Sequence, residues 1–440
     1  MFHKLLIANR GEIAIRIIKA CRQLNIKTVA VCSTVDRQAW YTQLADEVVC
    51  IGPAPAAESY LNAEAILMAA INTQADAIHP GYGFLAENAD FAAMCAECGI
   101  TWVGPTASQI RLMGDKSRAK DYARKQRVPV LAGASIQGLN WPQIKQLATK
   151  MGFPLVLKAS HGGGGKGIRV LSDVHALHQQ LRAARQEAAA AFLNDAMYLE
   201  HFLPQARHIE VQVLGTGNQL YILGDRDCSL QLHKQKVLEE SPASSLTAEQ
   251  RQELTRLSRQ LLANLGYQSL GTIEYLVADG ACYFMEMNTR LQVEHGVTEL
   301  TTGIDIVCAQ LKQAAGEPLA LPAMAAQTTH CVAIEARITA SLPLKQTLIQ
   351  QLDWPTDVRV DTGYRAGDHF VTRYDGLIAK LMVTGTTRTD AVKKMQTALA
   401  AVTLVGPTTN LSFLRQTVAR PAYLADTYSI HSLARWEGEQ

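Results

Sequence analysis

The sequence lacks the features that mark membrane, secreted and nucleic-acid-binding chains. None of its apolar runs approaches the roughly 20 residues that a transmembrane helix needs. The N-terminal segment, MFHKLLIANRGE, turns polar too soon for a signal peptide. The formal net charge of the 440 residues is only +2, so bulk electrostatics favour neither nucleic acid nor an acidic surface as a partner. We therefore expect a cytoplasmic protein that binds no nucleic acid and no membrane.

Cysteine pairing and dinucleotide motifs are also scarce. The nine cysteines stand mostly alone inside apolar segments, which is typical of buried thiols in a reducing cytosol. Cys95 and Cys98 form a single CxxC, and without a second pair they are weak evidence for zinc. The first strand-to-helix turn, ANRGEI, has one glycine and no GxGxxG, so a dinucleotide site is not expected.

The length of 440 residues predicts two or three domains, and the order of apolar segments predicts an α/β protein. Over residues 4–110, short apolar runs alternate with helical patterns, and this βαβ rhythm predicts an open parallel sheet. A smaller α/β unit follows, then a strand-rich body, and finally a region of strands with one helix. The predicted domains are 1–112, 113–320 with the smaller unit at about 131–205, and 330–436.

Residues 271–294 carry the densest chemistry in the chain. Asp279-Gly280 lies between two alternating apolar segments, which is a strong hairpin signal. With the turn centred near Gly280, Glu274 lies opposite Glu286. Two facing carboxylates repel unless a cation sits between them, and hard oxygen ligands suit Mg²⁺ or Mn²⁺ with phosphate completing the shell.

The alternation of polar residues continues beyond this hairpin. Glu286, Asn288, Arg290, Gln292 and Glu294 stand at every second position. In an extended chain these five side chains share one face. A solvated edge strand would alternate in the same way, but carboxylates, an amide and a guanidinium on one face favour a binding site.

A glycine-rich loop between two strands, residues 161–167, is a second candidate site. Four consecutive glycines let backbone N–H groups wrap an anion, although a flexible turn would read the same. The loop is not a Walker A motif, because Lys166 is followed by Gly167 and a strand. Lys158 stands inside the preceding apolar strand, where a phosphate would offset the cost of a buried ammonium. Most charges of the basic helix 117–127 are expected to form a solvated face.

Taken together, these stretches resemble the biotin carboxylase family, a branch of the ATP-grasp enzymes. The matching stretches are IANRGEIAIRII, DAIHPGYGFLAENA, IRLMGDK, LKASHGGGGKGIRV, RHIEVQVL, DRDCS, QKVLEESPA and EMNTRLQVEH, in family order. The resemblance implies an N-terminal open parallel-sheet domain, an ATP-grasp central region with a mobile glycine-loop lid, and a C-terminal α+β domain.

Each family role is carried over to a matching residue of this sequence. On the nucleotide side these residues are Lys116, Lys158, Gly164, Gly165, Glu200, His201, Phe202, Leu203, His208, Gln231 and Lys234. Glu274, Glu286 and Asn288 look like metal-site residues. Lys236, Arg290, Gln292 and Val293 would bind bicarbonate. Glu294 would deprotonate it, and Arg337 would hold the biotin oxygen as negative charge develops.

The implied reaction is ATP-dependent carboxylation of biotin through carboxyphosphate, with Mg²⁺ or Mn²⁺. Because no biotin-attachment Met-Lys-Met is present, the biotin would be held by a biotin carboxyl carrier protein. Carboxyltransferase subunits and a second copy of the chain, in a homodimer, are the other expected partners. Acetyl-CoA carboxylase of fatty acid synthesis is the expected assembly. The alternatives are an ATP-grasp ligase that joins a carboxylate to an amine, and a noncatalytic nucleotide-binding paralog.

The sequence departs from the family pattern at four places. Leu232 and His233 stand between Gln231 and Lys234, where two arginines are usual. Gly296 replaces a proline that would stiffen the turn after the base, and His161 replaces the first of five glycines. After Ala340 the segment is shortened, so the biotin side or the dimer surface is expected to differ.

Overall fold

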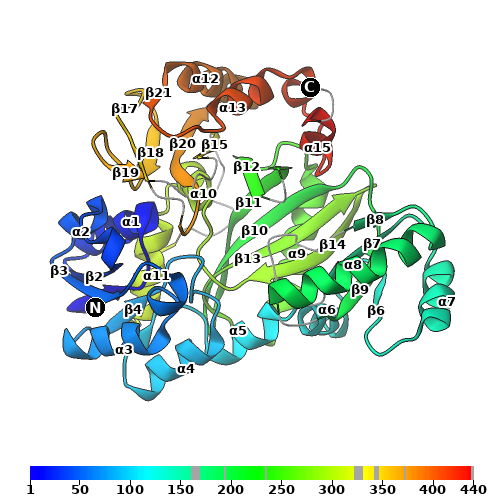
Figure 1. The fold of residues 1–440 in the computed structure, drawn as a ribbon, viewed down its shortest axis with the longest axis horizontal. Coiled ribbons are helices and arrows are strands. Elements are labelled where there is room, and N and C mark those ends of the chain that lie inside the picture. Colours follow the sequence, from blue (N-terminus) through cyan, green and yellow to red (C-terminus); the bar gives the residue numbers. More distant parts are fainter. Residues whose placement is uncertain are drawn as a thin grey trace.

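The structure is a computed structural model that describes residues 1–159, 169–192, 195–232, 235–321, 331–340, 346–370 and 373–437. Figure 1 shows three sheet-containing regions, with the N-terminal sheet and the smaller α/β unit at opposite ends of the view. A long antiparallel sheet lies between them, and the C-terminal helices cover its far end. The predicted mixed α/β class is confirmed.

The N-terminal region is the open parallel sheet that its βαβ rhythm predicts. Its strand order is β3-β2-β1-β4-β5, and every pairing is parallel. Asn62 and Asn88 cap α3 and α4 by accepting hydrogen bonds from the backbone N–H groups of Ala65 and Phe91. The strands are β1 (Lys4–Ile7), β2 (Lys27–Ser33), β3 (Glu47–Gly52), β4 (Ala77–His79) and β5 (Thr101–Trp102).

Five α-helices and two short 3₁₀ helices belong to this region, and a sixth helix leads out of it. They are α1 (Gly11–Gln23), η1 (Thr34–Asp36), α2 (Trp40–Leu44), η2 (Ala56–Glu58), α3 (Ala63–Asn72), α4 (Ala89–Glu97), α5 (Ala107–Gly114) and α6 (Lys116–Lys125). Gln310 of α11 and Leu291 reach back to the strand ends of this sheet, so the N-terminal region packs directly against the central body.

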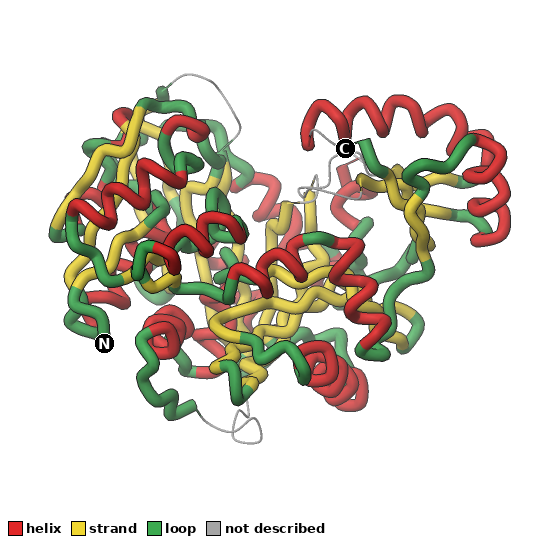
Figure 2. Tube along the Cα trace, turned by 90° about the horizontal axis from the view of Figure 1, so that it is seen from below, coloured by secondary structure: helices red, strands yellow, loops and turns green. Residues whose placement is uncertain are grey.

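The smaller unit has a sheet and a hydrophobic core of its own. Its four antiparallel strands have the order β6-β9-β7-β8, and Leu155, Leu157 and Leu199 pack beneath its two helices. In Figure 2 this unit again projects at one end of the molecule. Its elements are β6 (Gly133–Ser135), α7 (Trp141–Met151), β7 (Leu155–Ala159), β8 (Arg169–Leu171), α8 (Val174–Phe192) and β9 (Met197–His201).

One eight-stranded antiparallel sheet forms the body of the protein and runs on into the C-terminal region. Its strand order is β14-β13-β10-β11-β12-β15-β20-β18. These strands are β10 (Arg207–Thr216), β11 (Leu220–Leu232), β12 (Gln235–Ser241), β13 (Gln268–Ala278), β14 (Ala281–Asn288), β15 (Val332–Thr339), β18 (Arg359–Thr362) and β20 (Leu377–Gly385). The sheet therefore contains strands from both sides of the boundary at 320–330 between two of the predicted domains.

The two faces of this sheet differ in chemistry. Ile209 and Val211 of β10 pack with Leu257 of α9 in a hydrophobic core. His208 and Glu210 alternate with them, so their side chains point to the opposite face. That face carries the candidate site.

The remaining helices and strands cover the sheet and its C-terminal end. The helices are α9 (Ala248–Leu262), α10 (His295–Thr302), α11 (Ile306–Ala314), α12 (Arg388–Ala401), α13 (Leu411–Ala419), α14 (Pro421–Leu424) and α15 (Ser432–Glu437). Two short ladders pair β16 (Thr347–Leu348) with β19 (His369–Phe370) and β17 (Gln351–Asp353) with β21 (Thr403–Val405). Within the described ranges, no helix has the length and apolar character needed to cross a membrane.

Candidate active site

The predicted hairpin is present, and Glu274 lies opposite Glu286. Asp279 and Gly280 form the turn, with φ of 49° and 80°, the left-handed conformation that such a two-residue turn requires. A two-residue turn alone would place Glu274 opposite Met285. A β-bulge beside Glu274 inserts one residue into β14 and brings Glu286 into register instead.

The prediction of one continuous polar strand is wrong beyond Asn288. Strand β14 ends there, residues 289–294 form a loop, and Glu294 stands at the start of helix α10. The loop still returns Gln292 to the site, where its Nε2 donates to Glu274 Oε1 at 3.3 Å. Arg290 Nε lies 2.9 Å from Glu87 Oε2, and its Nη2 donates to Asn288 Oδ1 at 3.0 Å. The side chains therefore meet through loop geometry and not through strand alternation.

Lys236 is the centre of the cluster. Its Nζ lies 2.7 Å from Glu294 Oε1 and 3.3 Å from Glu274 Oε1, and it contacts Glu210 more closely still. Burial would lower the pKa of Lys236, but the three carboxylates raise it well above its usual range. The ammonium is thus a fixed positive charge among buried acids.

Glu294 is held between Lys236 and Arg337. Arg337 Nη2 donates to Glu294 Oε2 at 2.9 Å, and the carboxylate is fully buried. Burial would raise the pKa of Glu294, but Lys236 and then Arg337 outweigh it and hold the pKa well below its ordinary value. Glu294 is therefore ionised at neutral pH, as a proton acceptor must be.

A second group of cations lies on the lid side of the hairpin. Lys158 of β7 and Lys120 of α6 both contact the buried carboxylate of Glu200, and Lys116 contacts Glu286. Burial lowers the pKa of Lys158 to about 8, although Glu200 opposes the shift.

Lys120 was not expected to be functional. Most charges of the basic helix were predicted to form a solvated face, and Lys120 is an exception that is only 3% exposed. Its spacing of four residues from Lys116 places both on one helix face, and that signal could have identified it.

His208 and Gln231 lie together at the edge of the cluster. Gln231 Nε2 is 2.6 Å from His208 Nδ1, and His208 Nε2 is 3.0 Å from Glu274 Oε2. Burial would lower the pKa of His208, but Glu274 raises it. Glu210, buried between Lys236 and Arg226, was missed; its alternation with His208 on one apolar strand was the available signal.

Of the other predicted nucleotide residues, His201 ends β9, Phe202 and Leu203 follow it, and the rest lie outside the described residues. Phe202 packs against the ring of His431 at 4.7 Å between centroids, next to His201 and Leu203. Gly164, Gly165 and Lys234 are not among the described residues. On the bicarbonate side, the Val293 carbonyl accepts a hydrogen bond from the fully buried Lys380 at 2.7 Å.

The predicted metal ligands fit a hard divalent cation. Glu274 and Glu286 face each other, and Asn288 Nδ2 donates to Glu274 Oε1 at 2.6 Å, so three oxygen-bearing side chains share one edge. Within the described part of the chain, the ligand atoms of His208 and Glu210 also lie within 4.8 Å of those of Glu274.

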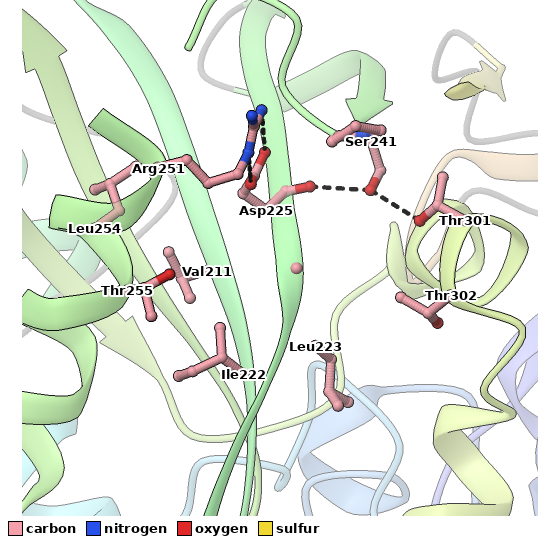
Figure 3. Close-up of a pocket in the computed structure, with 12 residues that line it drawn as sticks. Val211, Ile222, Leu223, Asp225, Ser241, Arg251, Leu254, Thr255, Thr301 and Thr302 are labelled. Carbon is pink, nitrogen blue, oxygen red and sulfur yellow. Dashed lines mark hydrogen bonds and ion pairs between the residues drawn. The ribbon is translucent and has the colours of Figure 1, made fainter. Parts of the chain in front are cut away.

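A separate cavity of about 170 Å³ lies beside strand β11, between residues of helices α9 and α10 (Figure 3). Its polar groups satisfy one another: Arg251 Nε lies 2.6 Å from Asp225 Oδ2, and Ser241 Oγ donates to the Asp225 carbonyl at 2.9 Å. None of the predicted site residues lines it.

Family models match nearly the whole chain. The biotin carboxylase N-terminal domain matches residues 1–110, the ATP-binding domain of the carbamoyl-phosphate synthase L chain matches 115–321, and the biotin carboxylase C-terminal domain matches 335–435. The fold and these matches define an ATP-grasp ligase.

Relatives and solved structures agree with that class. A biotin carboxylase of Haemophilus influenzae is 46% identical over 93% of both chains. The biotin carboxylase–β-γ-ATP complex of Campylobacter jejuni superposes with a TM-score of 0.94 at 38% identity over 99% of both chains. The biotin carboxylase domain dimer of Hydrogenobacter thermophilus 2-oxoglutarate carboxylase, with MgADP and bicarbonate, has a TM-score of 0.93 at 39% identity, covering 99% of this chain and 98% of that one. The chain belongs to the biotin carboxylase family.

Proposed function

We propose that the protein carboxylates carrier-bound biotin with ATP and bicarbonate, as the biotin carboxylase subunit of an acyl-CoA carboxylase. The observation that carries the proposal is the convergence of Lys236, Glu294 and Arg337 beside the carboxylate hairpin. Acetyl-CoA carboxylase in fatty acid synthesis is the assembly we favour. The cytoplasm is the proposed compartment, and a homodimer is the proposed oligomer.

The nucleotide is proposed to bind between the lid unit and the hairpin. Lys116 and Lys158 would turn from Glu286 and Glu200 to its phosphates, with His208 and Gln231 nearby. Glu274, Glu286 and Asn288 would hold Mg²⁺ or Mn²⁺, which supplies charge neutralisation for phosphoryl transfer. The lid, about 131–205, would close over ATP and exclude water.

Bicarbonate is proposed to bind beside Lys236, oriented by Arg290, Gln292 and Val293. Lys236 would then exchange a carboxylate partner for the bicarbonate anion, which frees one oxygen of Glu294. Glu294 takes the proton of bicarbonate, whose oxygen attacks the γ-phosphorus and gives carboxyphosphate and ADP. Losing the Lys236 contact also strengthens Glu294 as a base, since that contact lowers its pKa.

Arg337 is proposed to serve the biotin half of the reaction. Its guanidinium can donate hydrogen bonds to the ureido oxygen as negative charge develops there during transfer of the carboxyl group. The biotin would arrive on a biotin carboxyl carrier protein and leave for carboxyltransferase subunits.

The decisive test is bicarbonate-dependent phosphate release with free biotin and with a purified biotinylated carrier. Glu294→Gln keeps the shape and removes the base, so carboxylation should fall by about 10²–10⁴-fold while ATP affinity by calorimetry stays close to wild type. Arg290→Ala should behave similarly through lost anion orientation. If Glu294→Gln carboxylates biotin at the wild-type rate, the base lies elsewhere.

The same assay separates the alternatives. An amine ligase would hydrolyse ATP with a carboxylate and an amine and would not need bicarbonate. A noncatalytic paralog would bind ATP without turnover. Coupling the carboxylated carrier to carboxyltransferases for different acyl acceptors would test the acetyl-CoA assignment.

A further inference from the structure

Two fully buried glutamates face each other next to the proposed biotin site. Glu239 on β12 and Glu335 on β15 are direct partners in the antiparallel ladder, and both are 0% exposed. No carboxylate oxygen of either residue makes a well-aligned hydrogen bond to the described part of the protein. Two buried carboxylates directly opposite each other are costly, so their arrangement calls for a function.

Arg337 connects this pair to the proposed base. Its Nε lies 2.5 Å from Glu239 Oε1, and its Nη2 lies 2.9 Å from Glu294 Oε2. One guanidinium therefore bridges two carboxylates from different elements. Its orientation toward Glu294 depends on the anchor at Glu239.

We propose that Glu239 is the positioning residue that holds Arg337 against Glu294, and that Glu335 carries a proton, so that the facing pair bears one negative charge. The inference rests on the proposed function for its catalytic consequence. Glu239 touches neither substrate nor reacting atoms and acts only through Arg337.

The surrounding charges support a singly charged pair. Besides Arg337, the groups facing it are Lys236 on β12, Glu294 at the start of α10, Cys228 on β11 and Lys380 on β20. Lys380 is already occupied by the Val293 carbonyl at 2.7 Å and by Glu12 Oε1 at 3.3 Å.

The pKa shifts of Glu335 and Glu239 agree with that geometry. Burial raises the pKa of Glu335 well above its ordinary value, and Lys380 does not compensate. Burial also raises the pKa of Glu239, which Arg337 limits to about 7. Above this pH, Glu239 is ionised and the pair keeps one proton on Glu335. Below it, Glu239 is protonated and its ion pair with Arg337 is lost.

The chain offers a matched control on the same strand. Glu240 is also buried, but it alternates to the opposite face and pairs with Arg388, whose Nε lies 2.8 Å from Glu240 Oε2. Glu240→Gln removes an equally buried carboxylate without touching Arg337.

The experiment compares Glu239→Gln, Glu239→Asp, Glu240→Gln and Glu335→Gln in the bicarbonate-dependent carboxylation of biotin. We expect Glu239→Gln to lower kcat at least tenfold with an unchanged KM for ATP, Glu239→Asp to recover part of the rate, and Glu240→Gln to stay near wild type. In the wild type we expect kcat to fall as the pH drops through about 7. In Glu239→Gln the fall in kcat on the acid side should occur at lower pH. Glu335→Gln keeps a neutral donor and should lower kcat less than Glu239→Gln.

Two results would overturn the proposal: an unmoved acid limb in Glu239→Gln, or equal losses in Glu239→Gln and Glu240→Gln. The proton on Glu335 is tested without turnover. The infrared band of a protonated carboxyl group should be present in the wild type at pH 8 and absent in Glu335→Gln. If the wild type lacks bicarbonate-dependent turnover, the proposed function fails, and the infrared result still decides whether the pair holds its proton.

Discussion

Replacing Lys158 with methionine is expected to stabilise the nucleotide-free protein while it weakens ATP binding. Burial lowers the pKa of Lys158 from its ordinary value of 10.5 to about 8, with Glu200 opposing the shift and Lys120 adding to it. At 1.36 kcal/mol for each pKa unit, this difference makes the buried ammonium cost about 3 kcal/mol of folding free energy at neutral pH.

The sign follows from proton binding. The unfolded chain protonates Lys158 below 10.5, whereas the folded protein does so only below about 8, so protonation favours unfolding at pH 7. Methionine has nearly the same shape and no proton to bind. Lys158→Met should therefore raise the free energy of unfolding by about 3 kcal/mol at pH 7. The gain should shrink above pH 8 and vanish above 10.5, where the wild-type lysine is neutral in both states.

The assay is urea unfolding without nucleotide at pH 7, 9 and 10.5, beside ATP calorimetry. ATP affinity should fall at least about tenfold, because a charge-assisted phosphate contact is lost. Glu200→Gln is the opposite control: it leaves Lys120 and Lys158 without their carboxylate and should lower the urea midpoint. A lower midpoint for Lys158→Met at pH 7, or a gain that does not depend on pH, would refute the reasoning.

Two further predictions concern the metal site and the N-terminal sheet. Glu286→Gln should lose metal-dependent ATP turnover, because an amide offers less charge to the cation and to Lys116; an unchanged rate at saturating Mg²⁺ would rule out this ligand. Burial lowers the pKa of His79 to about 3, so the folded protein keeps it neutral and stability is lost as the pH falls through 6.5. Between pH 7.5 and 5 this loss should be about 2 kcal/mol, and urea titrations of His79→Gln should lack it.

The local parts of the fold were predictable because short-range patterns determine them. The parallel N-terminal sheet follows from its βαβ rhythm, and the hairpin follows from Asp279-Gly280. Helix α7 was missed although Asn140 and Gln143 form a capping box at its start, a signal that the sequence displays. Helix α10 was missed because the alternation through Glu294 was read as a strand.

Sequence spacing alone could not predict that the side chains of the site lie close together. Lys236, Glu210 and Arg337 come from β12, β10 and β15, and only the strand order of the large sheet brings them to one face. The roles expected for Lys236 and Arg337 came from the family resemblance. The facing of Glu239 and Glu335 depends on a long-range register that no local pattern encodes.

The glycine at position 296 raises the question of what fixes the proposed base. A proline there would have stiffened the turn, but a side-chain carbon at Gly296 would lie 2.4 Å from Met382 Sδ, inside the fully buried packing of β20 against α10. A larger residue at position 296 would therefore require the side chain of Met382 to move. Glu294 is fixed instead by ion pairs to Lys236 at 2.7 Å and to Arg337 at 2.9 Å. Since both contacts come from the residues proposed to bind bicarbonate and biotin, the substrates would loosen the base at the moment when it must accept a proton.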